Sequence, residues 1–226
     1  LIMKKAFSLT EMSIVIVILG LLIVAVTGGI GLINSSTDKI LIRQIRQFKI
    51  GANSFYDIYE YLPGDFPIAT TLWPNWYEPY ANCLLNTALD GNGNGRIETS
   101  NGVEDNSFFI HLVQFEHKIS NYLPSCRALD NTLLESSNPQ GPYDNSGYQI
   151  LDNSTVQKLN LRIGSYLEPN WNGGVLTASR AKKIDNKVDD GQAGQGLITG
   201  GGTNCLASTI YDTSQNCENC YLEFSL

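Results

Sequence analysis

Positive charge and histidine are both scarce in this sequence. It carries 15 Lys and Arg against 22 Asp and Glu, a formal net charge of −7, and has 2 His among 226 residues. The shortage of cations argues against sequence-independent nucleic-acid binding, which needs clustered Lys and Arg to neutralise phosphates. His111 and His117 fall on different faces of a predicted helix, so they build neither a zinc site nor a Ser–His pair. No serine-hydrolase, zinc-hydrolase or dinucleotide motif occurs, and we expect no enzyme.

Charge is absent altogether from one stretch near the N-terminus. No charged residue occurs from Met12 to Thr37, and Met12–Ile33 is almost wholly apolar. About 20 apolar residues are enough to cross a bilayer as a helix. Lys4 and Lys5 precede the run, which predicts a cytoplasmic N-terminus and a head outside the cytoplasm. Three interpretations follow: a secretory signal peptide, a plain signal anchor, or a leader that is cut before the apolar run.

Glu11 distinguishes these interpretations. An ionisable group at the start of an apolar membrane-spanning helix costs free energy unless it has a partner. A short basic leader, a small residue, Phe, a variable residue, Leu, a variable residue and Glu form the prepilin signature. This chain resembles it in the string Lys4-Lys5-Ala6-Phe7-Ser8-Leu9-Thr10-Glu11. The chain is therefore similar to type IV pilins and type II secretion pseudopilins over residues 4–34, with Ala6 where the family usually has Gly.

The resemblance implies how the N-terminus is processed and used. Prepilin peptidase would cut between Ala6 and Phe7 and methylate the new N-terminal Phe7, which makes Glu11 the fifth mature residue. Glu11 would then pair with the α-amino group of a neighbouring subunit, a buried ion pair that favours correct register. The expected segments are a leader peptide over residues 1–6, a transmembrane and assembly helix over 7–34, and a periplasmic or extracellular pilin-like head over 35–226.

Periodicity beyond the apolar run predicts an α+β fold. One apolar stripe continues the helix until Pro63-Gly64 stops it. The stripe consists of Leu41, Ile45, Phe48, Ala52, Phe55, Tyr59 and Leu62. A second helix is expected over Asn106–Leu123, and the strand candidates are Tyr148–Leu151, Leu161–Tyr166, Gly196–Thr199, Ala207–Tyr211 and Tyr221–Leu226. We expect a long N-terminal helix, transmembrane in its first half, packed on an antiparallel-sheet head with long loops.

Residues 90–98 have the spacing of a calcium loop. Oxygen-bearing side chains at positions 1, 3 and 5, Gly at 6 and an apolar residue at 8 match the EF-hand pattern. The candidate ligands are Asp90, Asn92, Asn94, the Arg96 carbonyl and Glu98. Asn101 replaces the bidentate Glu of position 12, so we expect weak affinity, and a Gly/Asn turn without an ion stays open as the alternative. A second acidic segment, residues 184–191, is expected to be a structural turn, and a second ion site stays open as the alternative.

Five cysteines leave at least one without a partner inside the chain. They are Cys83, Cys126, Cys205, Cys217 and Cys220. A head outside the cytoplasm favours disulfides. We expect a Cys83–Cys126 bond and a bond from Cys205 to either Cys217 or Cys220. The Cys217–Cys220 spacing is that of a redox motif, but no thioredoxin-like βαβ pattern surrounds it, so a structural role is favoured.

The sequence therefore predicts a structural subunit, a minor pilin or pseudopilin, of a type IV pilus or type II secretion filament. Its expected location is the bacterial inner membrane, crossed once with the head periplasmic, and then a filament or the cell surface. The expected partners are other pilin-like subunits, prepilin peptidase, the inner-membrane assembly platform and membrane lipid, with no nucleic acid. The alternatives are a filament-tip adhesin or binding module and a membrane-anchored periplasmic protein unrelated to filaments.

Overall fold

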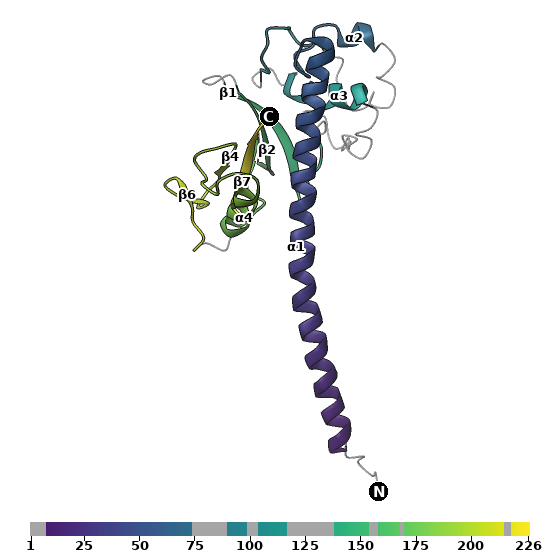
Figure 1. Ribbon diagram of the computed structural model, residues 1–226, viewed down its shortest axis with the longest axis vertical. Coiled ribbons are helices and arrows are strands. Elements are labelled where there is room, and N and C mark those ends of the chain that lie inside the picture. Colours follow the sequence, from purple (N-terminus) through teal and green to yellow (C-terminus); the bar gives the residue numbers. More distant parts are fainter. Residues whose placement is uncertain are drawn as a thin grey trace. The chain divides into compact units, whose positions relative to one another are not determined.

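The computed structural model describes residues 8–73, 90–98, 104–116, 138–153, 158–167, 170–214 and 218–226. The chain divides into two compact units, Leu1–Ile40 and Leu41–Leu226. Helix α1, Leu9–Tyr59, begins in the first unit and ends in the second (Figure 1). Ala6 and Phe7 lie outside the described residues, so the expected cleavage site and the segments 1–6, 7–34 and 35–226 stay predictions.

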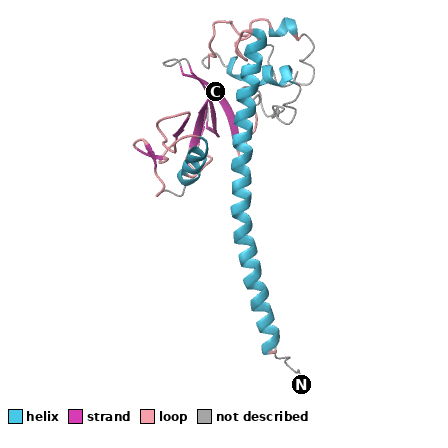
Figure 2. Ribbon diagram, viewed as in Figure 1, coloured by secondary structure: helices cyan, strands magenta, loops and turns pink. Residues whose placement is uncertain are grey.

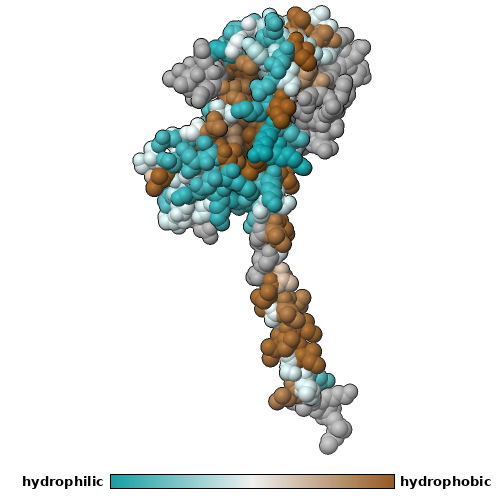
Figure 3. Space-filling model, viewed as in Figure 1, coloured by the Kyte–Doolittle hydropathy of each residue, from teal (hydrophilic) through white to brown (hydrophobic). Residues whose placement is uncertain are grey.

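The described part of the first unit is an apolar helix with exposed side chains. From Met12 to Val26 its large apolar residues are between 48% and 70% exposed. The segment Leu9–Val26 is long and apolar enough to cross a membrane, by length and composition. Figure 3 shows this surface in brown, where the head carries much teal. An apolar surface of this size is stable only when lipid or other apolar helices cover it.

The second unit contains an antiparallel sheet. Its strand order is β1-β2-β7-β4 (Figure 2). The short strand β3 pairs with the C-terminal end of β2, beyond the residues that pair with β7. The strands are β1 Ser146–Asn153, β2 Lys158–Leu167, β3 Asn170–Gly173, β4 Ile198–Gly201 and β7 Tyr221–Ser225. A separate hairpin pairs β5 Leu206–Ala207 with β6 Ile210–Tyr211. The helices after α1 are α2 Ala69–Leu72, α3 Glu104–Glu116 and α4 Ala178–Val188.

The core of the second unit lies between α1, α3 and the sheet. The predicted stripe of α1 is buried at Leu41, Ile45, Phe48, Ala52 and Phe55. Alternate residues of the strands face it, because side chains of a strand point to opposite faces in turn. These include Tyr148, Ile150, Leu161, Ile163, Leu222 and Phe224. The Phe48 ring meets the rings of Tyr148 at 5.1 Å and Phe109 at 5.4 Å. The fold class is therefore α+β, as the sequence predicted.

Several element boundaries differ from the predicted ones. Helix α1 ends at Tyr59, three residues before Leu62, because Glu60 adopts φ 60° and leaves the helical conformation. The expected strand Ala207–Tyr211 is a tight hairpin instead, in which Ser208 has φ 65°. Helix α3 begins at Glu104, before the predicted Asn106.

Helix α4 was not predicted at all. The Thr177 side chain accepts a hydrogen bond from the Arg180 N–H at 3.3 Å and caps the N-terminus of the helix. Ala178, Ala181 and Ile184 recur at intervals of three and are buried. This narrow stripe of small residues is a weak periodic signal in a segment otherwise rich in Lys and Asp.

Candidate functional site

Glu11 lies in the first turn of α1, where its carboxylate caps the helix. Its Oε2 atom accepts a hydrogen bond from the Ser8 N–H at 2.8 Å, and the Ser8 and Thr10 hydroxyls lie 2.7 Å apart. This is the return half of a capping box, in which the third helical residue bonds the backbone of the cap. Glu11 is exposed and has no cationic partner among the described residues. A capping role is therefore the local alternative to an assembly role.

The predicted calcium ligands lie in what we call the Asn loop, residues 90–98. Asn92 and Asn94 donate from their amide groups to the Glu98 carboxylate, at 3.1 and 2.9 Å. Asp90 instead accepts from the backbone N–H and the hydroxyl of Thr70 on α2, at 2.8 and 2.6 Å. The Arg96 N–H donates to Asn94 Oδ1 at 2.9 Å. The structure brings Asn92, Asn94 and Glu98 together and binds both Asp90 oxygens to α2. Calcium binding by this loop stays a prediction.

Two buried carboxylates, those of Asp65 and Glu104, hold the Asn loop. Asp65 is fully buried, and its Oδ1 accepts from the N–H groups of Gly93 at 2.7 Å and Asn94 at 3.1 Å. Its Oδ2 accepts from the Gly95 N–H at 2.7 Å. The carboxylate therefore satisfies three successive backbone donors. Only the turn residues around Asp65 gave any signal in the sequence.

Glu104, the second of these carboxylates, begins α3. It accepts from the backbone N–H groups of Asn92 at 3.0 Å and Glu98 at 2.7 Å. Burial raises the pKa of Glu104, and the two backbone hydrogen bonds oppose part of that rise. Two carboxylates outside the Asn loop therefore hold it. Glu104 binds Asn92 and Glu98, and Asp65 binds the three residues 93–95 between them.

His111 joins the same region from α3. Its Nδ1 accepts a hydrogen bond from the Gly64 N–H at 2.8 Å, and its ring stacks on Phe55 with 5.9 Å between centroids. Gly64 has φ 98°, and a Cβ there would lie 2.4 Å from the Glu104 carbonyl oxygen. The turn after α1 thus requires glycine. His111 packs in the core, as expected, with Nδ1 unprotonated.

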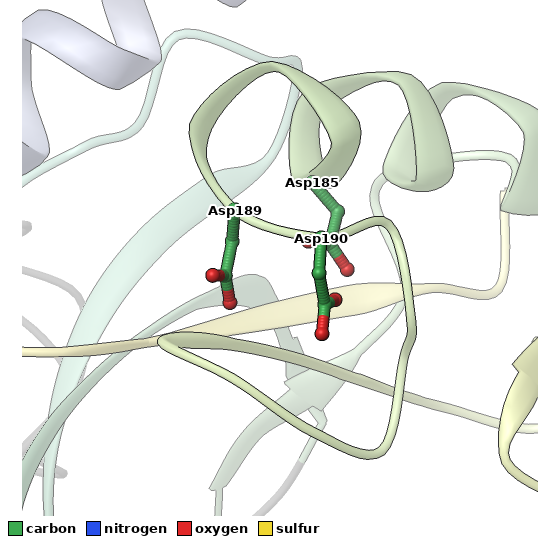
Figure 4. A group of neighbouring side chains, drawn as sticks. All are labelled: Asp185, Asp189 and Asp190. Atoms are coloured by element: carbon green, nitrogen blue, oxygen red, sulfur yellow. The ribbon is translucent and has the colours of Figure 1, made fainter.

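The second acidic segment forms what we call the Asp loop, residues 185–197. Carboxylate oxygens of Asp185, Asp189 and Asp190 all lie within 4.8 Å of one another (Figure 4). Asp185 is fully buried and accepts from the Gly191 N–H at 3.0 Å and the Tyr211 hydroxyl at 2.8 Å. Asp189 accepts from the Leu197 N–H and, at 3.1 Å, from the Ile198 N–H.

The electrostatics of the Asp loop follow from this burial. Burial raises the pKa of Asp185, while the Tyr211 and Gly191 hydrogen bonds oppose the rise. Burial also raises the pKa of Tyr211, which keeps its hydroxyl protonated as a donor. In the part of the chain that the structure describes, this is the one group of three carboxylates spaced for a single cation. Oxygen ligands of this kind suit a hard cation such as Ca²⁺.

The structure joins Cys205 to Cys220 in a disulfide, with 5.1 Å between their Cα atoms and a sequence separation of 15. Both residues are fully buried. Of the two partners that the sequence left open for Cys205, the structure therefore has Cys220. Cys83, Cys126 and Cys217 fall outside the described residues.

No protein-family model, curated protein or solved structure matches this chain. The case for a function therefore rests on the chain's own residues: the capped apolar helix, the α+β head and the two acidic loops.

Proposed function

We propose that the chain is a minor pilin or pseudopilin, a filament subunit that prepilin peptidase cuts between Ala6 and Phe7. The observation that carries the proposal is Glu11, a carboxylate in the first turn of a helix whose next residues are apolar and exposed. Once lipid or neighbouring helices cover that surface, an unpaired carboxylate is strongly disfavoured. Cleavage before Phe7 would create an α-amino group that can neutralise Glu11 of an adjacent subunit.

The α+β head supports this proposal without deciding it. A helix that is apolar on all sides in its first part and buries one stripe in its second part fits a subunit anchored by one end and folded at the other. The proposed subunit crosses the inner membrane once, with its head in the periplasm, before it enters a type IV pilus or a type II secretion filament. It is a structural protein and not an enzyme.

Mass spectrometry of the mature N-terminus tests the processing step. The expected result is a chain that begins with N-methylated Phe7. A chain that begins near residue 30 would identify a secretory signal peptide, and an unprocessed N-terminus would identify a plain membrane anchor. Either of these two results contradicts the proposal.

Substitution of Glu11 separates assembly from helix capping. Gln can make the same return hydrogen bond to the Ser8 N–H but has no charge, whereas Ala makes neither interaction. We expect both Glu11→Gln and Glu11→Ala to insert into the membrane and to be lost from purified filaments. If Glu11→Gln chains enter filaments as well as wild type does, the carboxylate is needed only as a cap, and its assembly role is wrong.

A further inference from the structure

The Asn loop contains two Asn-Gly pairs in succession, Asn92-Gly93 and Asn94-Gly95. The shape of the loop requires both glycines, because Gly93 has φ 71° and Gly95 has φ 83°, values that other residues rarely adopt. An asparagine followed by glycine is chemically labile. The backbone nitrogen of the glycine can attack the asparagine Cγ atom, and no Cβ hinders its approach. The turn that the loop needs therefore places two deamidation-prone pairs side by side.

Deamidation of such a pair needs only water and the groups of the pair itself. The glycine nitrogen loses its hydrogen as it bonds to Cγ, and the side-chain nitrogen leaves as ammonia, which closes a cyclic succinimide. Water then adds to the ring and opens it to aspartate or isoaspartate. Asn92 and Asn94 are both exposed, so water reaches them in the folded chain. Whether they react therefore depends on how the loop is held and not on burial.

The two attacking nitrogens are held by the buried carboxylate of Asp65. The Gly93 N–H donates to its Oδ1 and the Gly95 N–H to its Oδ2, both at 2.7 Å. The Gly93 N–H also donates to the Asp65 carbonyl oxygen at 3.1 Å. Asp65 is fully buried and cannot follow a movement of the loop. Each glycine nitrogen must therefore leave a charge-assisted hydrogen bond before it can attack.

The side-chain amides that would be attacked are also held at both of their ends. The amide nitrogens of Asn92 and Asn94 donate to the Glu98 carboxylate at 3.1 and 2.9 Å. The Oδ1 atom of Asn92 accepts from the Asn94 N–H, and that of Asn94 from the Arg96 N–H, both at 2.9 Å. Rotation of either Cγ towards the next glycine nitrogen breaks these bonds. The reaction therefore has to wait until the loop opens locally.

The products of the reaction do not fit the closed loop. An aspartate at position 92 or 94 cannot donate to Glu98, and it places a second carboxylate where an amide now lies 3.1 or 2.9 Å away. Two carboxylates at that separation repel each other. Isoaspartate instead lengthens the main chain and displaces the N–H groups that bind Asp65. Either product favours the open loop.

We propose that the Asn loop is a deamidation site that Asp65 and Glu98 keep closed. When the loop opens, Asn92 and Asn94 convert to aspartate or isoaspartate, and the charge that they gain prevents the loop from closing again. The change runs in one direction, so the modified fraction increases with the time that the loop has spent open. This inference concerns the head alone and does not depend on the proposed filament function.

Ageing of the full-length chain in detergent tests the protection. The buffer is mildly alkaline and contains a chelator, and peptide mass spectrometry measures conversion at Asn92 and Asn94. Conversion should be at least about tenfold slower in the folded chain than in the same chain unfolded in urea. Equal rates in the two samples overturn the proposal.

Substitution of Asp65 tests which group protects the loop. Asp65→Asn keeps one acceptor oxygen and should raise conversion at Asn92 and Asn94 about tenfold. Asn172, which forms an Asn-Gly pair in β3, is the control within the same sample and should convert at the wild-type rate. An unchanged rate at Asn92 and Asn94 contradicts the role of Asp65. An equal rise at Asn172 contradicts it too, because general unfolding then explains both.

Amide hydrogen exchange tests whether the modified loop stays open. The double variant Asn92→Asp and Asn94→Asp reproduces the charge of the product, and exchange at Gly93 and Gly95 should speed up about tenfold. The double variant Asn92→Ser and Asn94→Ser loses the same donors to Glu98 without adding charge and should speed up less. Asn172→Asp is the control and should leave both glycines unchanged. If the charged variant exchanges as slowly as wild type, the loop closes after modification and the proposal is wrong.

Discussion

The Asn loop and the Asp loop look alike in sequence but are held in different ways. Both are acidic, glycine-rich segments in which carboxylates accept hydrogen bonds from backbone N–H groups. The carboxylates that hold the Asn loop belong to Asp65 and Glu104, up to 30 residues away in sequence. Those that hold the Asp loop belong to its own residues Asp185 and Asp189, at most 9 residues from their backbone N–H donors. Only in the Asp loop do three carboxylates gather closely enough for one cation.

Replacement of Asp65 should break the Asn loop and give the largest effect. Asp65→Ala removes three hydrogen bonds to a charged, buried carboxylate. The Gly93 and Asn94 N–H groups keep the Asp65 carbonyl and Asn92 Oδ1 as acceptors, but the Gly95 N–H loses its acceptor. We expect a loss of about 4 kcal/mol in the free energy of unfolding. Asp65→Asn keeps one acceptor oxygen and should lose about half as much. Denaturant unfolding of the full chain in detergent measures both. Asp144→Ala, at an exposed position, is the control, and a loss as large as that of Asp65→Ala would contradict this explanation.

Removal of the disulfide should weaken the Asp loop and spare the Asn loop. Cys205→Ser with Cys220→Ser opens a loop of sequence separation 15, worth about 3 kcal/mol in the chain-entropy model. Tyr211, which binds Asp185, lies inside that loop. Amide hydrogen exchange should therefore speed up at Leu197 and Ile198 but not at Gly93 or Gly95. Equal acceleration in the two loops would show that they are not independent.

Asp189→Ala should have a smaller effect, because it removes one acceptor from the N–H groups of Leu197 and Ile198 near the surface. We expect a loss of about 2 kcal/mol in the free energy of unfolding. Asp190→Ala removes only the acceptor of the Gln192 N–H at an exposed position and should lose about 0.5 kcal/mol. If the two variants are equally stable, the hydrogen bonds of Asp189 do not hold the loop.

The smallest expected effect is on the dependence of stability on pH. Burial raises the pKa of Glu104 above its ordinary value of 4.5, so the folded chain holds this proton more tightly than the unfolded chain. The stability that this provides is complete below pH 4.5 and is lost as the pH rises through the raised value. Glu104→Gln should flatten this decline, and Asp185→Asn should do the same for the other loop. If the free energy of unfolding of both variants changes with pH as steeply as that of the wild type, Glu104 and Asp185 do not cause the decline.

Local patterns predicted the helix and the core better than the loops. The stripe from Leu41 to Phe55 has a clear helical period, and the structure buries it. The hydrogen bonds of Asp65 and Glu104 to the Asn loop could not be predicted, because contacts between residues far apart in the chain produce no periodic pattern in the sequence. Asp90 has ligand spacing in the sequence, but its oxygens bind Thr70, a contact that only the folded arrangement of α2 creates.

The position of β7 in the sheet determines when the sheet can be completed during synthesis of the chain. Strand β7 is among the last residues of the sequence, yet it lies between β2 and β4 and pairs with both. While the chain is being synthesised from its N-terminus onward, β2 therefore has an open hydrogen-bonding edge until β7 is made, and such an edge is a site for incorrect strand pairing. Strand β7 can enter the sheet, and Cys220 can bond to Cys205, only after α1 and β2 have been synthesised.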